Sequence, residues 1–204
     1  MDWNVILEFL KAIYIPQPTQ YLFQITNWID PNYITAEYVF WLKHEWLWTQ
    51  PDKVKEAIFE GYNVSFDQVL YNKRKRPTYV GSIVVDWDST EIPDFGVHPS
   101  YILNSGRHYH IGWFFKYLVW YEELQPYKCG MLEKWSEIDP YSRPVIHHYR
   151  IPTDMNYKRG VNKPLKLVFF DPSLRYDPFE MFGKLGVVAR KCNPTTYKVV
   201  KEVG

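Results

Sequence analysis

The chain has 204 residues and a formal net charge of +1, with 46% apolar and 23% charged residues. These proportions are those of a globular protein, so they exclude an intrinsically disordered chain, and the length suits a single domain. A net charge this close to zero gives no general attraction to nucleic acid or to a membrane surface. The four consecutive basic residues at 73–76 form a local patch that could still act.

The two cysteines and the N-terminal segment bear on the compartment. Cys129 and Cys192 are far apart and match no metal-binding or redox spacing, so we expect reduced thiols in a cytosolic setting. The first residues lack a basic region followed by an apolar run, and no window is apolar enough to cross a bilayer. The sequence therefore predicts a cytoplasmic protein.

The first half of the chain is expected to alternate helices with strands. Apolar residues at helical spacing follow Asp2, which is a suitable cap, and Asp30 with Pro31 has the form of a helix start. Alternating apolar residues on both sides of the basic run predict a β-hairpin. The expected elements are helices at 2–13, 30–47 and 49–61, and strands at 21–25, 64–71 and 79–87.

The stretch from 92 to 124 is the centre of the expected fold. An apolar run at 92–98 predicts a strand, a polar loop with glycine follows, and apolar residues around most of the circumference of 109–124 predict a buried helix. A strand, loop and helix in this order offer free N–H groups and a positive helix end to an anion such as a pyrophosphate. Further strands are expected at 127–135, 145–151, 165–170 and 197–203.

Two of these segments resemble the GNAT family, the GCN5-related N-acetyltransferases. The run Tyr-Val-Gly-Ser-Ile-Val-Val at 79–85 is similar to the family's third strand, and Phe-Gly-Val-His-Pro-Ser-Tyr at 95–101 is similar to its fourth strand and exit. The resemblance covers 21–170. The aromatic-rich composition is similar to that of the diverged bacteriophage members of the family. The resemblance implies an α/β (α+β) fold with a mixed, mostly antiparallel central sheet and helices on both faces. We therefore expect one domain at 1–170, with a helical extension at 1–18 and a C-terminal extension at 171–204.

The resemblance also implies a cofactor site. In the family acetyl-CoA lies between the splayed fourth and fifth strands, and its pyrophosphate sits on the following loop. The matching strand and loop residues are Phe95, Val97, Asn104, Ser105, Gly106, Arg107 and His108. The loop departs from the family pattern, because Ile102 stands where a basic residue is usual and Ser105 stands where the first glycine is usual.

The candidate catalytic residues come from the same resemblance. Asp94 matches the position of the family's general base, and Tyr141 lies near the position of its general acid. Each also has a plain structural interpretation, as a solvated carboxylate and a surface tyrosine. His108 and His110 form an H-x-H pair, but no cysteine or acidic partner lies nearby in sequence, so no metal site is expected.

Three functions remain open at this stage. The first is an acyl-CoA-dependent N-acetyltransferase, phage-encoded as the resemblance to the bacteriophage members implies, in which the eroded loop leaves enzymatic activity undecided. The second is a catalytically degenerate structural or interaction protein, either a virion component or a host-protein inhibitor, with protein partners in an oligomer or larger assembly. The third is nucleic-acid binding through 73–76, but this run is expected to be a solvated turn, so nucleic acid is not an expected partner.

Overall fold

The computed structural model describes residues 2–29 and 38–193. Its helices are α1 (Trp3–Tyr14), α2 (Trp46–Thr49), α3 (Pro51–Glu56), α4 (Tyr121–Lys134) and α5 (Pro178–Lys184), with a 3₁₀ turn η1 (Pro140–Ser142). Its strands are β1 (Leu22–Trp28), β2 (Tyr38–Lys43), β3 (Asn63–Asp67), β4 (Val69–Tyr71), β5 (Pro77–Trp87), β6 (Tyr101–Asn104), β7 (Tyr109–Trp120), β8 (His148–Arg150), β9 (Met155–Asn156), β10 (Lys163–Pro164), β11 (Lys166–Phe170) and β12 (Arg175–Tyr176).

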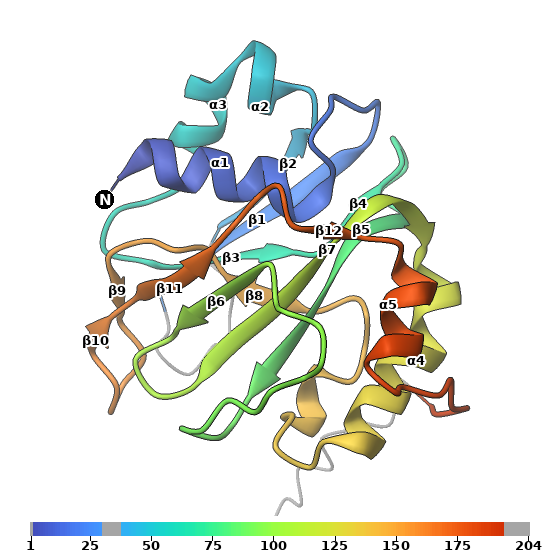
Figure 1. Cartoon of the computed structure of the whole chain (residues 1–204). Helices are drawn as coiled ribbons and strands as arrows, with labels where there is room; N and C mark the ends of the chain where they lie inside the picture. The colour runs from blue at the N-terminus through green and yellow to red at the C-terminus, as the bar shows by residue number, and fades with distance from the viewer. Residues whose placement is uncertain (1, 30–37, 194–204) are drawn as a thin grey trace, which may run out of the picture.

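One large sheet organises the molecule. Its strands run in the order β11-β6-β7-β5-β4-β1-β3-β8, with β2 paired to β1 and β12 paired to β7. Every pairing is antiparallel except that of β12 with β7. Helices α1, α2 and α3 lie on one side of the sheet, whereas α4 and α5 lie on the other (Figure 1). The expected α+β class with a mixed, mostly antiparallel sheet is confirmed.

The central strands β5 and β7 have buried side chains on both faces. Val84 and Phe114 belong to the core beneath α1, whereas Ile83, Val85 and Trp113 belong to the core beneath α4 and α5. Successive side chains of a strand point to opposite faces, so a strand covered on both sides is apolar at nearly every position. This double burial makes β5 and β7 the most deeply placed part of the sheet.

The end of α1 sits directly on β5. A Cβ added at Gly81 would collide with the carbonyl oxygen of Tyr14, so only glycine allows the helix and strand to approach this closely. The Tyr14 hydroxyl also donates a hydrogen bond of 2.7 Å to the carbonyl oxygen of Asp67. The contact fixes the position of β5, which carries the candidate site at its far end.

The segment at 109–124 is a correction to the expected fold. Residues 109–120 form β7 and not a helix, because burial on both faces of a strand gives the same all-round apolar pattern as a buried helix. The helix begins only at Tyr121, so the strand expected at 127–135 is part of α4. The run at 92–98 contains no strand, and β6 at 101–104 replaces part of the expected loop.

The remaining predicted helices and strands are partly confirmed. Helix 2–13, the hairpin around 73–76, and strands near 21–25 and 165–170 are confirmed. The helix expected at 30–47 is wrong over 38–43, which is strand β2, while 30–37 and the strand at 197–203 lie outside the described residues. The expectation of reduced thiols is wrong as well, because the fold pairs Cys129 with Cys192 in a disulfide.

None of the helices in 2–29 and 38–193 is long and apolar enough to cross a membrane.

Candidate active site

Two carboxylates stand at the end of β5. Asp86 is in the strand and Asp88 follows it, so the two side chains are two positions apart and point to the same face. The chain before η1 pairs with this end: the amide of Asp139 donates to the carbonyl of Asp86 at 2.8 Å, and the amide of Asp88 donates to the carbonyl of Glu137 at 2.7 Å. The isolated bridge between Trp87 and Ile138 places Asp139 directly opposite Asp86.

These three carboxylates repel one another. Burial, with the charges of Asp88 and Asp139 as smaller causes, raises the pKa of Asp86 to about 7 against the opposing effect of Arg150 and Lys128. Burial also raises the pKa of Asp88, and the charge of Asp139 adds to the effect. Like charges held together in a partly buried place repel one another, and a bound cation would reduce this repulsion.

His110 lies beside Asp86 on the neighbouring strand. The two residues are register partners in β5 and β7, and His110 Nε2 is 3.8 Å from a carboxylate oxygen of Asp86. The Nδ1 atom accepts a hydrogen bond of 3.4 Å from the amide of Arg150, and burial lowers the pKa of His110 well below its usual value. The ring is therefore neutral, with its proton on Nε2 and facing the carboxylates.

A cleft of about 320 Å³ is lined by Asp86, Asp139 and His110, whereas Asp88 is not part of its lining. Basic and imidazole side chains also line this cleft, and burial lowers the pKa of His147 to about 3 and that of His148 to about 4, so both rings are neutral. The Arg150 guanidinium donates to Asn63 at 2.9 Å. The residues lining this carboxylate cleft are Trp28, Ser65, Asp86, His110, Asp139, His147, His148, Tyr149, Arg150 and Lys158.

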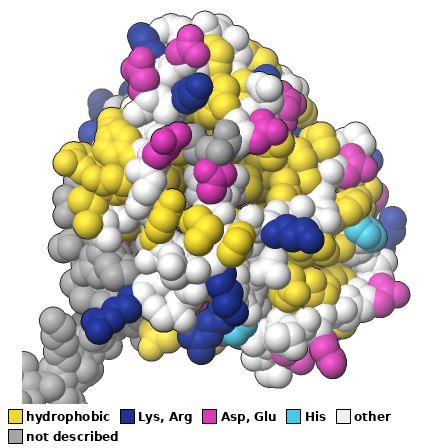
Figure 2. Space-filling model, turned by 90° about the vertical axis from the view of Figure 1, so that its left-hand side faces the viewer, with side chains coloured by type: hydrophobic (Ala, Val, Ile, Leu, Met, Phe, Trp, Pro, Cys, Tyr) yellow, Lys and Arg dark blue, Asp and Glu magenta, His cyan; other side chains and the backbone are white. Residues whose placement is uncertain are grey.

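The segment between β9 and β10 supplies Lys158 to the cleft. On the face of the molecule that carries these two short strands, Lys and Arg side chains gather in one area beside a histidine (Figure 2). Positive charge and carboxylates in the lining of one cleft suit a ligand that carries both phosphates and metal ions.

A buried lysine is hydrogen-bonded to the backbone of β5 close to Asp86. Lys128 of α4 has no exposed surface, and its ammonium donates to the carbonyl of Val84 and to the hydroxyl of Tyr149. Burial lowers the pKa of Lys128 to about 7, while the charge of Asp86 opposes this change. The Tyr149 hydroxyl donates in turn to the carbonyl of Val84 at 2.8 Å. This network fixes the backbone two residues before Asp86.

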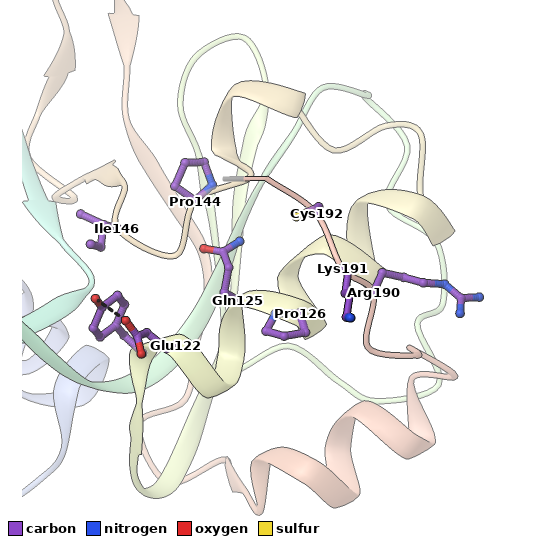
Figure 3. Close-up of a pocket in the computed structure, with 9 residues that line it drawn as sticks. Glu122, Gln125, Pro126, Pro144, Ile146, Arg190, Lys191 and Cys192 are labelled. Carbon is purple, nitrogen blue, oxygen red and sulfur yellow. Dashed lines mark hydrogen bonds between the residues drawn. The ribbon is translucent and has the colours of Figure 1, made fainter. Parts of the chain in front are cut away.

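A larger cavity of about 760 Å³ lies elsewhere, at the start of α4 (Figure 3). Its lining includes Pro126, Pro144 and Ile146, and its carboxylate, Glu122, accepts a hydrogen bond from the Tyr121 hydroxyl. It brings together no group of carboxylates or imidazoles. The smaller carboxylate cleft is therefore the better candidate for chemistry.

The residues expected to catalyse acyl transfer are not brought together. Asp94 is exposed and accepts a hydrogen bond of 2.8 Å from the amide of Gly96, which forms a local turn. Tyr141 lies in η1 with 62% of its surface exposed and does not line the carboxylate cleft. Neither position has the burial expected of a general acid or base.

The expected cofactor residues also have other roles. Phe95 packs edge-on against Trp113, and the carbonyl of Val97 accepts from the indole of the same Trp113. The loop at 104–108 joins β6 to β7, two antiparallel strands, so it leads into no helix and offers no positive helix end to a pyrophosphate. Within it the Asn104 side chain accepts from the amide of Gly106, and the Ser105 hydroxyl donates to the carbonyl of His108.

Two of these loop residues do reach the carboxylates. His108 Nδ1 is 2.8 Å from an Asp88 oxygen, and the charges of His108 and Arg107 both lower the pKa of Asp88. The signal that sequence reasoning missed is Asp86-Trp87-Asp88 directly after an apolar strand, which puts two carboxylates on one face of a strand end.

Comparisons with known proteins were made by sequence and by structure. The sequence matches no protein-family model and no curated protein. The structure is similar to the AEP domain (PP-N190) of the cyanophage S-2L primase-polymerase, with a TM-score of 0.66, 17% identity, and coverage of 90% of this chain and 98% of that chain. The chain has the fold of an archaeo-eukaryotic primase domain.

Two structures of primase RepB′ support the same fold. One is its catalytic domain in complex with initiator DNA, with a TM-score of 0.62, 14% identity, and coverage of 90% of this chain and 93% of that chain. The other is RepB′ itself, with a TM-score of 0.61, 16% identity, and coverage of 90% of this chain and 62% of that chain.

The archaeo-eukaryotic primase fold corrects the functional expectations. The resemblance to GNAT acetyltransferases is wrong, and the acetyl-CoA cofactor and the acyl-transfer activity fall with it. The alternative of a virion component or host-protein inhibitor is overturned by the same likeness to primase catalytic domains. The exclusion of nucleic acid is also wrong, since one of the similar structures is a complex with initiator DNA.

Proposed function

We propose that this chain is a DNA primase-polymerase domain that joins nucleotides on a DNA template with the help of divalent metal ions. The observation that carries the proposal is the meeting of Asp86, Asp88 and Asp139 at one end of β5, beside a cleft that Arg150 also lines. The likeness to primase domains supports the choice of DNA as template.

The carboxylates fit a divalent metal ion by their chemistry. Carboxylate oxygens are the ligands that Mg²⁺ prefers, and pairs of such ions are used by polymerases. In 2–29 and 38–193, no three His, Cys, Asp or Glu side chains are already gathered around one point. Asp88 is turned toward His108, so metal binding requires its carboxylate to move from that imidazole. The pKa values of Asp86 and Asp88 are both raised by burial and by the charge of Asp139, and a bound cation would oppose both effects.

The reaction is attack of a 3′-oxygen on the α-phosphorus of a nucleoside triphosphate, with pyrophosphate leaving. A divalent ion held by the three carboxylates would neutralise phosphate charge and orient the attacking oxygen. Arg150 and Lys158, which line the same cleft, bind the triphosphate, since a guanidinium can hold two phosphate oxygens at once. His110 donates its Nε2–H to a phosphate oxygen and does not act as a base, because its pKa is low.

The proposal is tested by nucleotide incorporation. Purified protein is mixed with a single-stranded template, with or without an annealed primer, and with labelled nucleotides and Mg²⁺ or Mn²⁺. We expect extended products from the wild type and none from Asp86→Asn/Asp88→Asn. Asp94→Asn is the matched control, since it neutralises a nearby exposed carboxylate outside the cleft, and it keeps full activity.

Two outcomes of this assay would contradict the proposal. One is the absence of extension with either metal and either template. The other is extension that survives in the double variant. Shortened strands in place of extended ones would assign the same carboxylates to phosphodiester hydrolysis.

A further inference from the structure

A second basic feature lies at the opposite end of β5. The turn between β4 and β5, residues 73–76, carries two lysines and two arginines and is here called the basic turn. Nine residues of extended chain, 77–85, separate it from Asp86, so the two lie roughly 30 Å apart along β5. Figure 1 shows the two features at the two ends of β5, so the basic turn is not part of the carboxylate cleft.

The backbone of the basic turn is held rigidly. The Asn72 side chain accepts hydrogen bonds from the amides of Arg74 at 2.9 Å and Arg76 at 3.1 Å. The Asn72 backbone amide donates to the carbonyl of Arg76 at 2.9 Å, and its carbonyl accepts from the amide of Lys75 at 2.9 Å. A fixed turn presents its side chains at fixed places, which lowers the entropy lost when a ligand binds.

The charges of the basic turn have no acidic partner in residues 2–29 and 38–193. All four side chains are exposed, and none of them forms an ion pair with an acidic residue of the described chain. Elsewhere exposed cations do find acidic partners, as Arg190 does with Glu133 at 2.7 Å. Four uncompensated charges in a row repel one another, so an anionic ligand relieves the repulsion.

The surroundings add a cleft and aromatic faces. A cleft of about 440 Å³ beside the turn is lined by Gln20, Tyr21, Asn72, Lys73, Arg74 and Arg76. Tyr21 contacts Tyr79 with ring centroids 5.4 Å apart, and Tyr79 contacts Trp120 at 5.5 Å. All three rings are partly exposed. Cations next to partly exposed rings are what proteins use to hold single-stranded nucleic acid, with phosphates on the cations and bases on the rings.

We propose that the basic turn and these aromatic side chains form a second contact for single-stranded DNA, distant from the carboxylates. The choice of DNA rests on the proposed function. A DNA template that runs along β5 to the carboxylate cleft would be bound at both ends of β5, by the basic turn at one end and by the cleft at the other. The repeating phosphates of DNA match a row of lysines and arginines better than the scattered carboxylates of a protein do.

The test is the salt dependence of DNA binding. Binding of labelled oligo-dT is measured by fluorescence anisotropy over a series of salt concentrations, without nucleotide or divalent metal. In Lys73→Ala/Arg74→Ala/Arg76→Ala we expect the slope of log affinity against log salt to fall in magnitude by about 2, since each phosphate contact on a single strand contributes about 0.7. Circular dichroism verifies that the variant is folded.

Two control variants separate the turn from charge in general. Lys53→Ala/Lys55→Ala/Lys184→Ala removes the same charge from exposed helix positions and keeps the wild-type slope. Arg74→Lys/Arg76→Lys keeps the charge of the turn and also keeps the slope. An unchanged slope in the triple turn variant, or an equal fall in the helix control, would overturn the proposal.

The remaining outcomes are also distinct. If the turn variant loses affinity for an acidic polypeptide such as polyglutamate but not for oligo-dT, the turn binds protein and the proposal is overturned. If wild-type protein incorporates no nucleotide but the slope falls as expected, the DNA contact stands and the proposed catalysis fails. If wild-type protein incorporates nucleotide but the slope of the turn variant is unchanged, the proposed catalysis stands and the DNA contact at the basic turn fails.

Discussion

The backbone of Asp139 is hydrogen-bonded to that of Asp86, with the amide of the first donating to the carbonyl of the second at 2.8 Å. This bond fixes a carboxylate from the chain before η1 opposite a carboxylate of β5. The third member of the candidate site is therefore set by the fold and not by proximity in sequence.

Asp139→Asn is expected to lower nucleotide incorporation on the order of 100-fold or more. The substitution keeps the size of the side chain and the backbone bond but removes one charge that would help to hold a metal ion, and such an ion stabilises the transition state by several kcal/mol. The measurement is the rate of primer extension under saturating nucleotide. Glu137→Gln, which changes a neighbouring carboxylate, serves as control, and equal losses in both variants would contradict the assignment.

Arg150→Ala is expected to raise the KM for nucleotide roughly 10- to 100-fold with a smaller change in kcat, because a lost charge-assisted contact to phosphate weakens substrate binding. The variant also loses the bond from Arg150 to Asn63. Asn63→Ala removes the same bond but keeps the guanidinium, so it should leave KM near the wild-type value. A KM that rises equally in both variants would mean that Arg150 acts only on the structure.

Gly81→Ala is expected to destabilise the protein by about 1–3 kcal/mol, because the added methyl meets the carbonyl of Tyr14 and forces α1 away from β5. Gly183→Ala is the matched control. Its Cβ would meet no atom within 4 Å, and alanine is the better helix former in α5 by up to about 1 kcal/mol. Urea unfolding of both variants measures the difference, and equal stabilities would contradict the packing described.

Asp67 predicts a pH-dependent stability. It is 1% exposed, its carboxylate accepts from the Tyr71 hydroxyl at 2.5 Å and from the Val69 amide at 3.0 Å, and burial raises its pKa from 3.8 to about 7. Because the folded state binds the proton more tightly, the stabilisation is complete below pH 4 and is lost as the pH rises through 7.

The check on Asp67 is the free energy of unfolding at pH 5 and at pH 8. The wild type should lose about 2–3 kcal/mol more than Asp67→Asn over this interval. Asp86, whose pKa is also raised to about 7, contributes a loss of the same sign in both proteins and therefore cancels in the comparison. An identical pH dependence of the two proteins would contradict the raised pKa of Asp67.

Local patterns in the sequence predict much of the fold. The Asp2 cap with its helix, and the alternation at 79–87, each depend on near neighbours, and both appear as expected. The pattern fails at 109–120, because Phe114 faces one core and Trp113 the other, so a strand covered on both faces has no period of two.

The site is harder to predict than the fold. Asp86 and Asp88 form a visible pair, but their meeting with Asp139 depends on the bridge between Trp87 and Ile138, which joins distant parts of the chain. His110 and Arg150 reach the cleft through the pairing of β7 with β5 and of β8 with β3. Residue spacing does not encode such long-range contacts. The motifs at 79–85 and 95–101 resemble GNAT strands, but this resemblance predicts the wrong fold family.

Single-nucleotide incorporation on a defined template tests the central claim most directly. The wild type is given a primed DNA template with one unpaired base at the next position, divalent metal, and each of the four nucleotides separately. The account predicts a product one nucleotide longer only with the complementary nucleotide, with release of pyrophosphate, and no product from Asp86→Asn/Asp88→Asn. Addition that ignores the template base, or no addition at all by the wild type, would contradict it.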